Sequence, residues 1–141
     1  KKLRFLDKLE SNGTRPAMIE EAIKKKLVDY IAMDIKSTMS KYSQTVARPV
    51  DVVAIRKSIQ IIMSSNIEYE FRTTVIKALI APEDFHEIGR EIRGARGYFL
   101  QKFIPTNILN PQFKKKVTYS DEEFKSFQEI MNTYVNHCEI R

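Results

Sequence analysis

The sequence predicts an α/β fold, a partial (β/α) barrel with a parallel sheet of four to five strands and helices on its outer face. Segments with strand-like alternation and segments with helical spacing follow one another along the chain, which is typical of βα units. The chain has 141 residues, whereas eight such units take about 250, so a closed barrel is not expected. We expect residues 1–141 to form a single domain.

Turn and cap residues predict where the elements begin and end. The turn Ser11-Asn12-Gly13 closes the first strand, and Pro16 suits the first turn of a helix. Asp51 is expected to cap the next long helix, and Ser120 with Glu123 has the spacing of a capping box. The expected strands are Leu3–Glu10, Asp29–Lys36, Ile67–Ile76, Tyr98–Ile104 and a short Cys138–Arg141; the expected helices are Pro16–Lys26, Asp51–Ser65, Glu83–Arg93 and one after Ser120; Lys36–Val46 is a loop or short helical turn, and Pro105–Tyr119 is a loop.

Composition and charge narrow the class of protein. The chain is 43% apolar and 30% charged with few Gly and Pro, as in soluble globular proteins. It contains neither an apolar run near the roughly 18 residues of a membrane span nor a secretory apolar region, so we expect a cytoplasmic protein without a membrane partner. The net charge is +6, but acids interrupt the basic residues and no aromatic platform flanks the runs Lys24–Lys26 and Lys114–Lys116. A nucleic-acid partner is therefore not expected.

The chain contains one cysteine, Cys138. One cysteine excludes an internal disulfide framework and any multi-cysteine metal site built by this chain. His86 and His137 are isolated in the sequence pattern and are expected at the surface or in packing positions. We therefore assign no metal ligand and no catalytic residue to the chain itself.

Polar residues alternate with apolar ones in the expected strands. Residues two apart in a strand share a face, so Glu68, Glu70, Arg72 and Thr74 lie together opposite an apolar set. In the other expected strands, one face likewise carries a set of residues two apart. These sets are Lys8, Glu10 and Asn12; Tyr30, Ala32, Asp34 and Lys36; and Phe99, Gln101 and Phe103. A sheet buried on both faces has nearly continuous apolar strands, so this polar face either lies in water or binds a ligand. The agreement of four strands favours a ligand.

The expected polar face suits an anionic, ribose-bearing small molecule. In α/β sheets ligands bind at the carboxyl ends of the strands, where several of these residues fall. Lys36 and Arg72 suit a carboxylate or phosphate, and Asp34 or Glu10 suits a ribose diol or an ammonium group. Phe99 or Phe103 would flank a base. An aminoacyl nucleoside, a nucleotide and a sugar phosphate remain open.

Four motifs resemble those of one known family. They are Lys8–Pro16, Leu27–Lys36, Glu70–Thr74 and Leu100–Phe103. In order and spacing they resemble radical S-adenosylmethionine (SAM) proteins of the type that activates anaerobic ribonucleoside-triphosphate reductase, relatives of the pyruvate formate-lyase activating enzyme. The resemblance implies that residues 1–141 form the C-terminal portion of the family's partial barrel.

The resemblance also implies a function. In this family, SAM lies across the carboxyl ends of the strands and binds one iron of a 4Fe-4S cluster. An electron from a reductant such as flavodoxin or ferredoxin cleaves it to methionine and a 5′-deoxyadenosyl radical, which removes hydrogen from a glycine of a partner enzyme. Asp34 to Lys36 matches the cofactor-contacting strand end, Arg72 the group for the methionine carboxylate, and Gln101 to Phe103 the strand that supports the adenine. The cofactor-binding residues expected here are Glu10, Ser11, Asn12, Asp34, Lys36, Arg72, Thr74, Gln101 and Phe103.

The chain departs from the family upstream of these motifs. The cluster motif C-x-x-x-C-x-x-C and the Gly-Gly-Glu strand end are absent, and one cysteine cannot supply three thiolates. We therefore expect no radical chemistry from this chain alone. The alternative is a non-catalytic nucleotide-binding or protein-interaction half-barrel, which uses Lys114–Lys116 and an open sheet edge to bind a protein. A barrel enzyme of sugar-phosphate metabolism is disfavoured because the late glycine-rich phosphate loop is missing.

Overall fold

The computed structural model describes residues 5–104 and 117–141. Five parallel strands form one sheet in the order β1-β2-β3-β4-β5. The prediction of an α/β fold with a parallel sheet is confirmed, and the order of the strands is consistent with a partial barrel. The strands are β1 (Lys8–Ser11), β2 (Tyr30–Asp34), β3 (Glu68–Val75), β4 (Tyr98–Lys102) and β5 (Cys138–Ile140), and the helices are α1 (Pro16–Lys24), α2 (Tyr42–Thr45), α3 (Val52–Ser64), α4 (Asp84–Glu91) and α6 (Asp121–Asn132).

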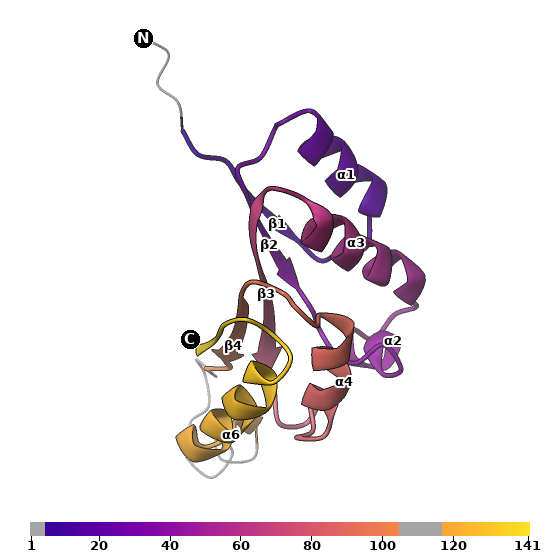
Figure 1. The fold of residues 1–141 in the computed structure, drawn as a ribbon. Helices are drawn as coiled ribbons and strands as arrows, with labels where there is room; N and C mark the ends of the chain where they lie inside the picture. Colours follow the sequence, from indigo (N-terminus) through magenta and orange to yellow (C-terminus); the bar gives the residue numbers. More distant parts are fainter. Residues whose placement is uncertain (1–4, 105–116) are drawn as a thin grey trace.

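The helices cover one face of the sheet. Figure 1 shows α1, α3 and α4 following one another along one side of the strands, while α6 contacts α4, β4 and β5. Side chains of that face, such as Ile31, Phe71 and Leu100, are fully buried and join one apolar core with the inward sides of the helices. The alternate residues point to the opposite, concave face. Burial of the first set provides the main stabilisation of the fold.

Several observed strands are shorter than the expected ones; β2, for example, spans Tyr30–Asp34 where Asp29–Lys36 was expected. β1 begins at Lys8, where it pairs with Tyr30, and residues 5–7 precede the strand, whereas Leu3 lies outside the described residues. The expected short helical turn after Lys36 is α2. Most of the expected loop 105–119, including Lys114–Lys116, lies outside the described residues. Within the described ranges, no helix has the length and apolarity needed to cross a bilayer.

Two predicted helix caps are present. Asp51 Oδ1 accepts hydrogen bonds from the backbone N–H groups of Val53 and Ala54, at 2.9 and 3.3 Å. Glu123 N–H donates to Ser120 Oγ at 3.2 Å, and Ser120 N–H donates to Glu123 Oε2 at 2.8 Å. These reciprocal bonds form the capping box that the sequence spacing predicts, and they satisfy donors that a helix start leaves unpaired.

Replacing Ser120 with alanine is expected to lower the free energy of unfolding by about 1 kcal/mol, because the side-chain half of the capping box is lost. The shift in the urea midpoint measures this effect. Ser126→Ala is the matched control, since Ser126 lies within α6 and its hydroxyl donates only to the carbonyl of Glu122. Alanine at that position should be neutral or slightly stabilising. Equal destabilisation by both variants would contradict the capping role.

Candidate functional site

The centre of the concave face is a network of charged side chains around Arg72. Arg72 Nε donates to Asp34 Oδ1, and Arg72 Nη1 donates to Glu10 Oε1 at 3.1 Å. Lys36 Nζ donates to the second oxygen of Asp34 at 2.7 Å. The register of the sheet explains this, because Asp34 pairs directly with Arg72 and Glu10 lies beside Ala32 on the same face. Four of the expected site residues therefore meet: Glu10 of β1, Asp34 of β2, Arg72 of β3, and Lys36, which follows β2.

The network is partly buried and its charges are balanced. The side chain of Arg72 is 14% exposed and that of Asp34 is 24% exposed. Burial alone raises the pKa of Asp34, but hydrogen bonds from Arg72 and Lys36 outweigh it and hold the pKa below its ordinary value. The hydrogen bond from Arg72 likewise lowers the pKa of Glu10. The two carboxylates therefore face two cationic side chains, and the formal charges of these four residues balance.

The lowered pKa values predict a pH dependence of stability. A carboxylate whose pKa is lower in the folded state stabilises the fold fully above its unfolded pKa, and this contribution disappears as the pH falls through the folded pKa. We expect Arg72→Gln to destabilise the chain at pH 7 and to have progressively less effect as both carboxyl groups become protonated in acid. Urea unfolding of both proteins at several pH values below 7 measures this. Arg96→Gln is the control, because Arg96 forms an exposed ion pair with Glu68. A difference between wild type and Arg72→Gln that stays constant into acid would contradict the prediction.

Ser11 and Asn12 shape the turn after β1 and do not enter the charged network. Ser11 Oγ accepts from Gly13 N–H at 3.0 Å, and Asn12 Oδ1 accepts from the N–H and hydroxyl of Thr14 at 3.1 and 2.7 Å. Gly13 has a φ of +74°, and a Cβ there would lie 2.1 Å from Met33 Cε. The turn therefore needs glycine for its backbone conformation, whereas the flexible end of the Met33 side chain can move aside for a Cβ.

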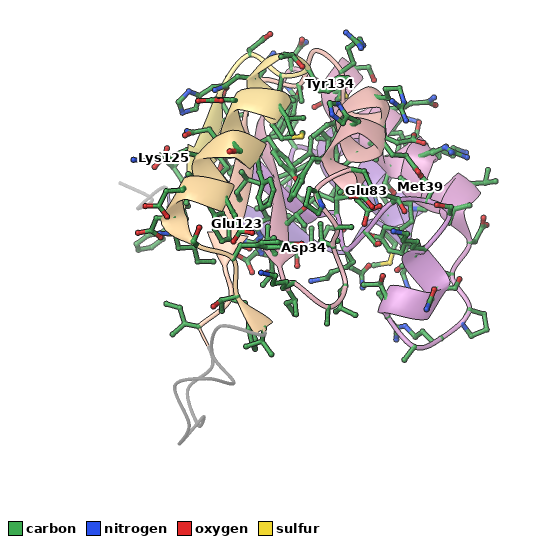
Figure 2. All side chains as sticks on the ribbon, turned by 90° about the horizontal axis from the view of Figure 1, so that it is seen from below. Asp34, Met39, Glu83, Glu123, Lys125 and Tyr134 are labelled. Atoms are coloured by element: carbon green, nitrogen blue, oxygen red, sulfur yellow. The ribbon has the colours of Figure 1, made fainter. Side chains whose placement is uncertain are left out.

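Thr74, Gln101 and Phe103 lie toward the carboxyl end of the sheet. Thr74 pairs with Gln101 in the register, and its hydroxyl donates to Gln101 Oε1 at 3.3 Å. Phe103 follows β4 and is half buried. In the view from below, Asp34 lies near the middle of the molecule (Figure 2). The expected residues thus divide into the charged network, the neighbouring Thr74–Gln101 pair, and the turn after β1.

Glu70 is the central residue that sequence reasoning did not select. Its side chain is only 3% exposed. The carboxylate accepts from the Tyr30 hydroxyl at 2.9 Å and from Arg141 Nη1 at 3.1 Å, and Lys8 Nζ lies 3.6 Å away. Desolvation, together with the hydrogen bond to Glu70, raises the pKa of Tyr30 to about 12. Glu70 lies two residues before Arg72 in β3, and this spacing alone places both side chains on the same face of the sheet.

A hollow lies beside β1, at the edge of the sheet. Its volume is about 740 Å³, within the range of small-molecule pockets. Glu10, Ser11 and Asn12 line it, with side chains of α1 and of the segment 48–51. Asp34 and Arg72 are not among the residues that line it. We place the site on the charged network, where the complementary chemistry is.

The chain does not fit an iron–sulfur cluster. Cys138 is buried in the core, where desolvation raises the pKa of its thiol to about 12 and so disfavours the thiolate that ligates iron. In the portion of the chain that the structure describes, no three His, Cys, Asp or Glu side chains are grouped as metal ligands. The described residues therefore do not supply the thiolates that a cluster requires.

Comparison with known proteins gives one informative similarity. No family model matches the chain. The chain is 32% identical over 141 residues to a protein of Methanocaldococcus jannaschii named "putative glycyl-radical enzyme activating enzyme". This similarity supports the resemblance to glycyl-radical activating proteins. The alignment covers 97% of the chain but 59% of the relative, so the chain spans about three fifths of that protein's length.

Proposed function

We propose that the chain is the SAM-holding portion of a glycyl-radical-enzyme activating protein. The observation that carries this proposal is the Arg72 network, which presents a guanidinium between two carboxylates near the carboxyl ends of parallel strands. Such a set suits a zwitterion, because the guanidinium binds a carboxylate and the carboxylates accept from an ammonium group. The name of the M. jannaschii relative supports the same activity.

The exposure of the two carboxylates indicates how a zwitterion would enter. Glu10 is 61% exposed and Asp34 is 24% exposed, so Glu10 leaves Arg72 more readily. The carboxylate of the methionyl group would take the place of Glu10 on Arg72, and the released Glu10 would accept from its ammonium group. Asp34 would keep Arg72 oriented and Lys36 would add a second cation. The Thr74–Gln101 pair and Phe103 would lie toward the adenosine.

The cofactor and partners follow from the proposed family. Bound next to a reduced 4Fe-4S cluster, SAM supplies a 5′-deoxyadenosyl radical. The cluster ligands would come from outside these 141 residues, because the chain has one cysteine. The partner would be a glycyl radical enzyme, either an anaerobic ribonucleotide reductase or a lyase, and the reductant a flavodoxin or ferredoxin. This chain by itself would not perform the reaction.

Calorimetric titration of the chain with SAM tests the proposal. We expect binding that Asp34→Asn weakens and that Arg96→Gln leaves unchanged, since Arg96 lies away from the network. Anaerobic treatment with iron and sulfide should give no cluster absorbance. Absence of SAM binding in a folded chain, or a stable cluster on it, would overturn the assignment. Preference for ATP over SAM would favour the nucleotide-binding half-barrel instead.

A further inference from the structure

The carboxylate of Glu70 joins the two edges of the sheet. Glu70 lies on β3, the central strand, and its side chain is almost completely buried although it is on the concave face. Lys8 reaches it from β1 at one edge, and Arg141 reaches it from the end of β5 at the other. Tyr30 on β2 adds a hydrogen bond. Cations from both edges therefore converge on one buried carboxylate.

Small neighbours of Glu70 make these long contacts possible. Ala32, its partner on β2, offers only a methyl group, and Lys8 reaches Glu70 with its ammonium nitrogen 5.4 Å from the centre of the Tyr30 ring. On the other side, Phe71 pairs with Tyr98, which places Gly97 next to Glu70. The guanidinium carbon of Arg141 lies 3.3 Å from the centre of the Phe99 ring. The cation–π contact fixes the direction of Arg141.

Lys8 connects Glu70 to the Arg72 network. Its ammonium nitrogen lies 3.6 Å from Glu70 Oε1 and 3.8 Å from Glu10 Oε1. Glu10 in turn accepts from Arg72 at 3.1 Å. Opposite charges therefore alternate without a break across the concave face, in the order Arg141, Glu70, Lys8, Glu10, Arg72, Asp34 and Lys36.

We infer that Glu70 is a positioning residue for Arg72: it holds Lys8 between two carboxylates, and Lys8 holds Glu10 in the orientation in which Glu10 binds Arg72. Without the charge of Glu70, Lys8 is free to pair with Glu10 alone. Glu10 then turns toward Lys8 and shares less of its charge with Arg72. A role of Glu70 limited to local stability predicts no change at Arg72, and this difference makes the two roles separable.

The first test uses the ligand-free chain and does not depend on the proposed function. The Nε–H resonance of Arg72 is recorded by NMR in wild type, in Glu70→Gln and in Glu68→Gln. Glu68 is the matched control, because it lies on the same strand and face but pairs with Arg96. We expect Glu70→Gln to shift or broaden the resonance and Glu68→Gln to leave it unchanged. An unchanged resonance in folded Glu70→Gln overturns the inference.

A second variant covers the case in which Glu70→Gln does not fold. Lys8→Met removes the connecting ammonium group from a side chain that is about half exposed, so the fold is expected to survive. It leaves Glu70 its contacts with Tyr30 and Arg141. The inference predicts that Lys8→Met also changes the Arg72 resonance, because the group that orients Glu10 is lost. If Lys8→Met leaves that resonance unchanged, Glu70 does not act through Lys8 and the inference is wrong.

A third test measures SAM affinity and rests on the proposed function. We expect Glu70→Gln to weaken binding by about tenfold in wild type and to have no further effect in an Arg72→Leu background, because coupled residues are non-additive. An equal loss in both backgrounds overturns the inference while leaving the proposed function intact. If wild type binds no SAM, the proposed function fails and the two NMR measurements decide the role of Glu70.

Discussion

Replacing Arg72 with leucine is expected to weaken SAM binding by about 30-fold or more, since loss of one partner of a desolvated charge pair costs about 2 kcal/mol or more. The guanidinium is the group that contacts both carboxylates of the site, and little of it is exposed to water. Leucine leaves the ligand carboxylate without its fork of donors. It also leaves Asp34 with Lys36 as its remaining cation on the face.

Titration calorimetry on three variants separates charge from geometry at this position. Arg72→Lys keeps the positive charge but loses the planar fork, so its affinity should lie between those of wild type and Arg72→Leu. Arg96→Gln also removes an arginine, but one that forms an exposed ion pair with Glu68, so this variant should bind SAM as wild type does. Affinity of Arg72→Leu within a factor of about three of wild type would show that the carboxylate of SAM binds elsewhere, since coupling of about 2 kcal/mol would be missing.

The alternation of β3 is the reason that much of the site was predictable. Period 2 places Glu70, Arg72 and Thr74 on one face by geometry alone. Parallel strands align their carboxyl ends. The position of Asp34 at the end of β2 therefore predicts that it lies near Arg72, and the register confirms this. Thr74 and Gln101 meet for the same reason. The alternation within each strand therefore predicts the face of the sheet on which a site residue lies, and the parallel order of the strands predicts the end.

Register and side-chain reach were not predictable in this way. Ser11 and Asn12 lie at the expected strand end, but their side chains hydrogen-bond within the turn, a local alternative that short polar residues favour. The importance of Glu70 depends on Lys8 and Arg141 reaching it from two strands away. Such contacts depend on the exact register and on Arg141, which follows a strand of three residues with no periodicity to detect.

Replacing Phe71 with alanine is expected to lower the free energy of unfolding by about 3–5 kcal/mol, the usual cost of a cavity left by a core aromatic ring. Phe71 is fully buried and packs against the helices, with the Tyr69 ring 5.3 Å away. At about 3–4 °C per kcal/mol for a chain of this size, the melting temperature should fall by about 10–20 °C. Urea unfolding and calorimetry measure both quantities. Phe5→Ala is the control, because Phe5 is exposed.

The same variant tests whether the two faces of β3 act separately. Phe71 lies between Glu70 and Arg72 in sequence, yet its side chain points into the core while theirs point to the concave face. At a temperature where Phe71→Ala is still folded, SAM affinity should therefore stay within about threefold of wild type, whereas folded Arg72→Leu should lose affinity by about 30-fold or more. If Phe71→Ala instead lost affinity as strongly as Arg72→Leu, packing of the outer face would determine the geometry of the charged network. The concave face would then not be an independent binding surface.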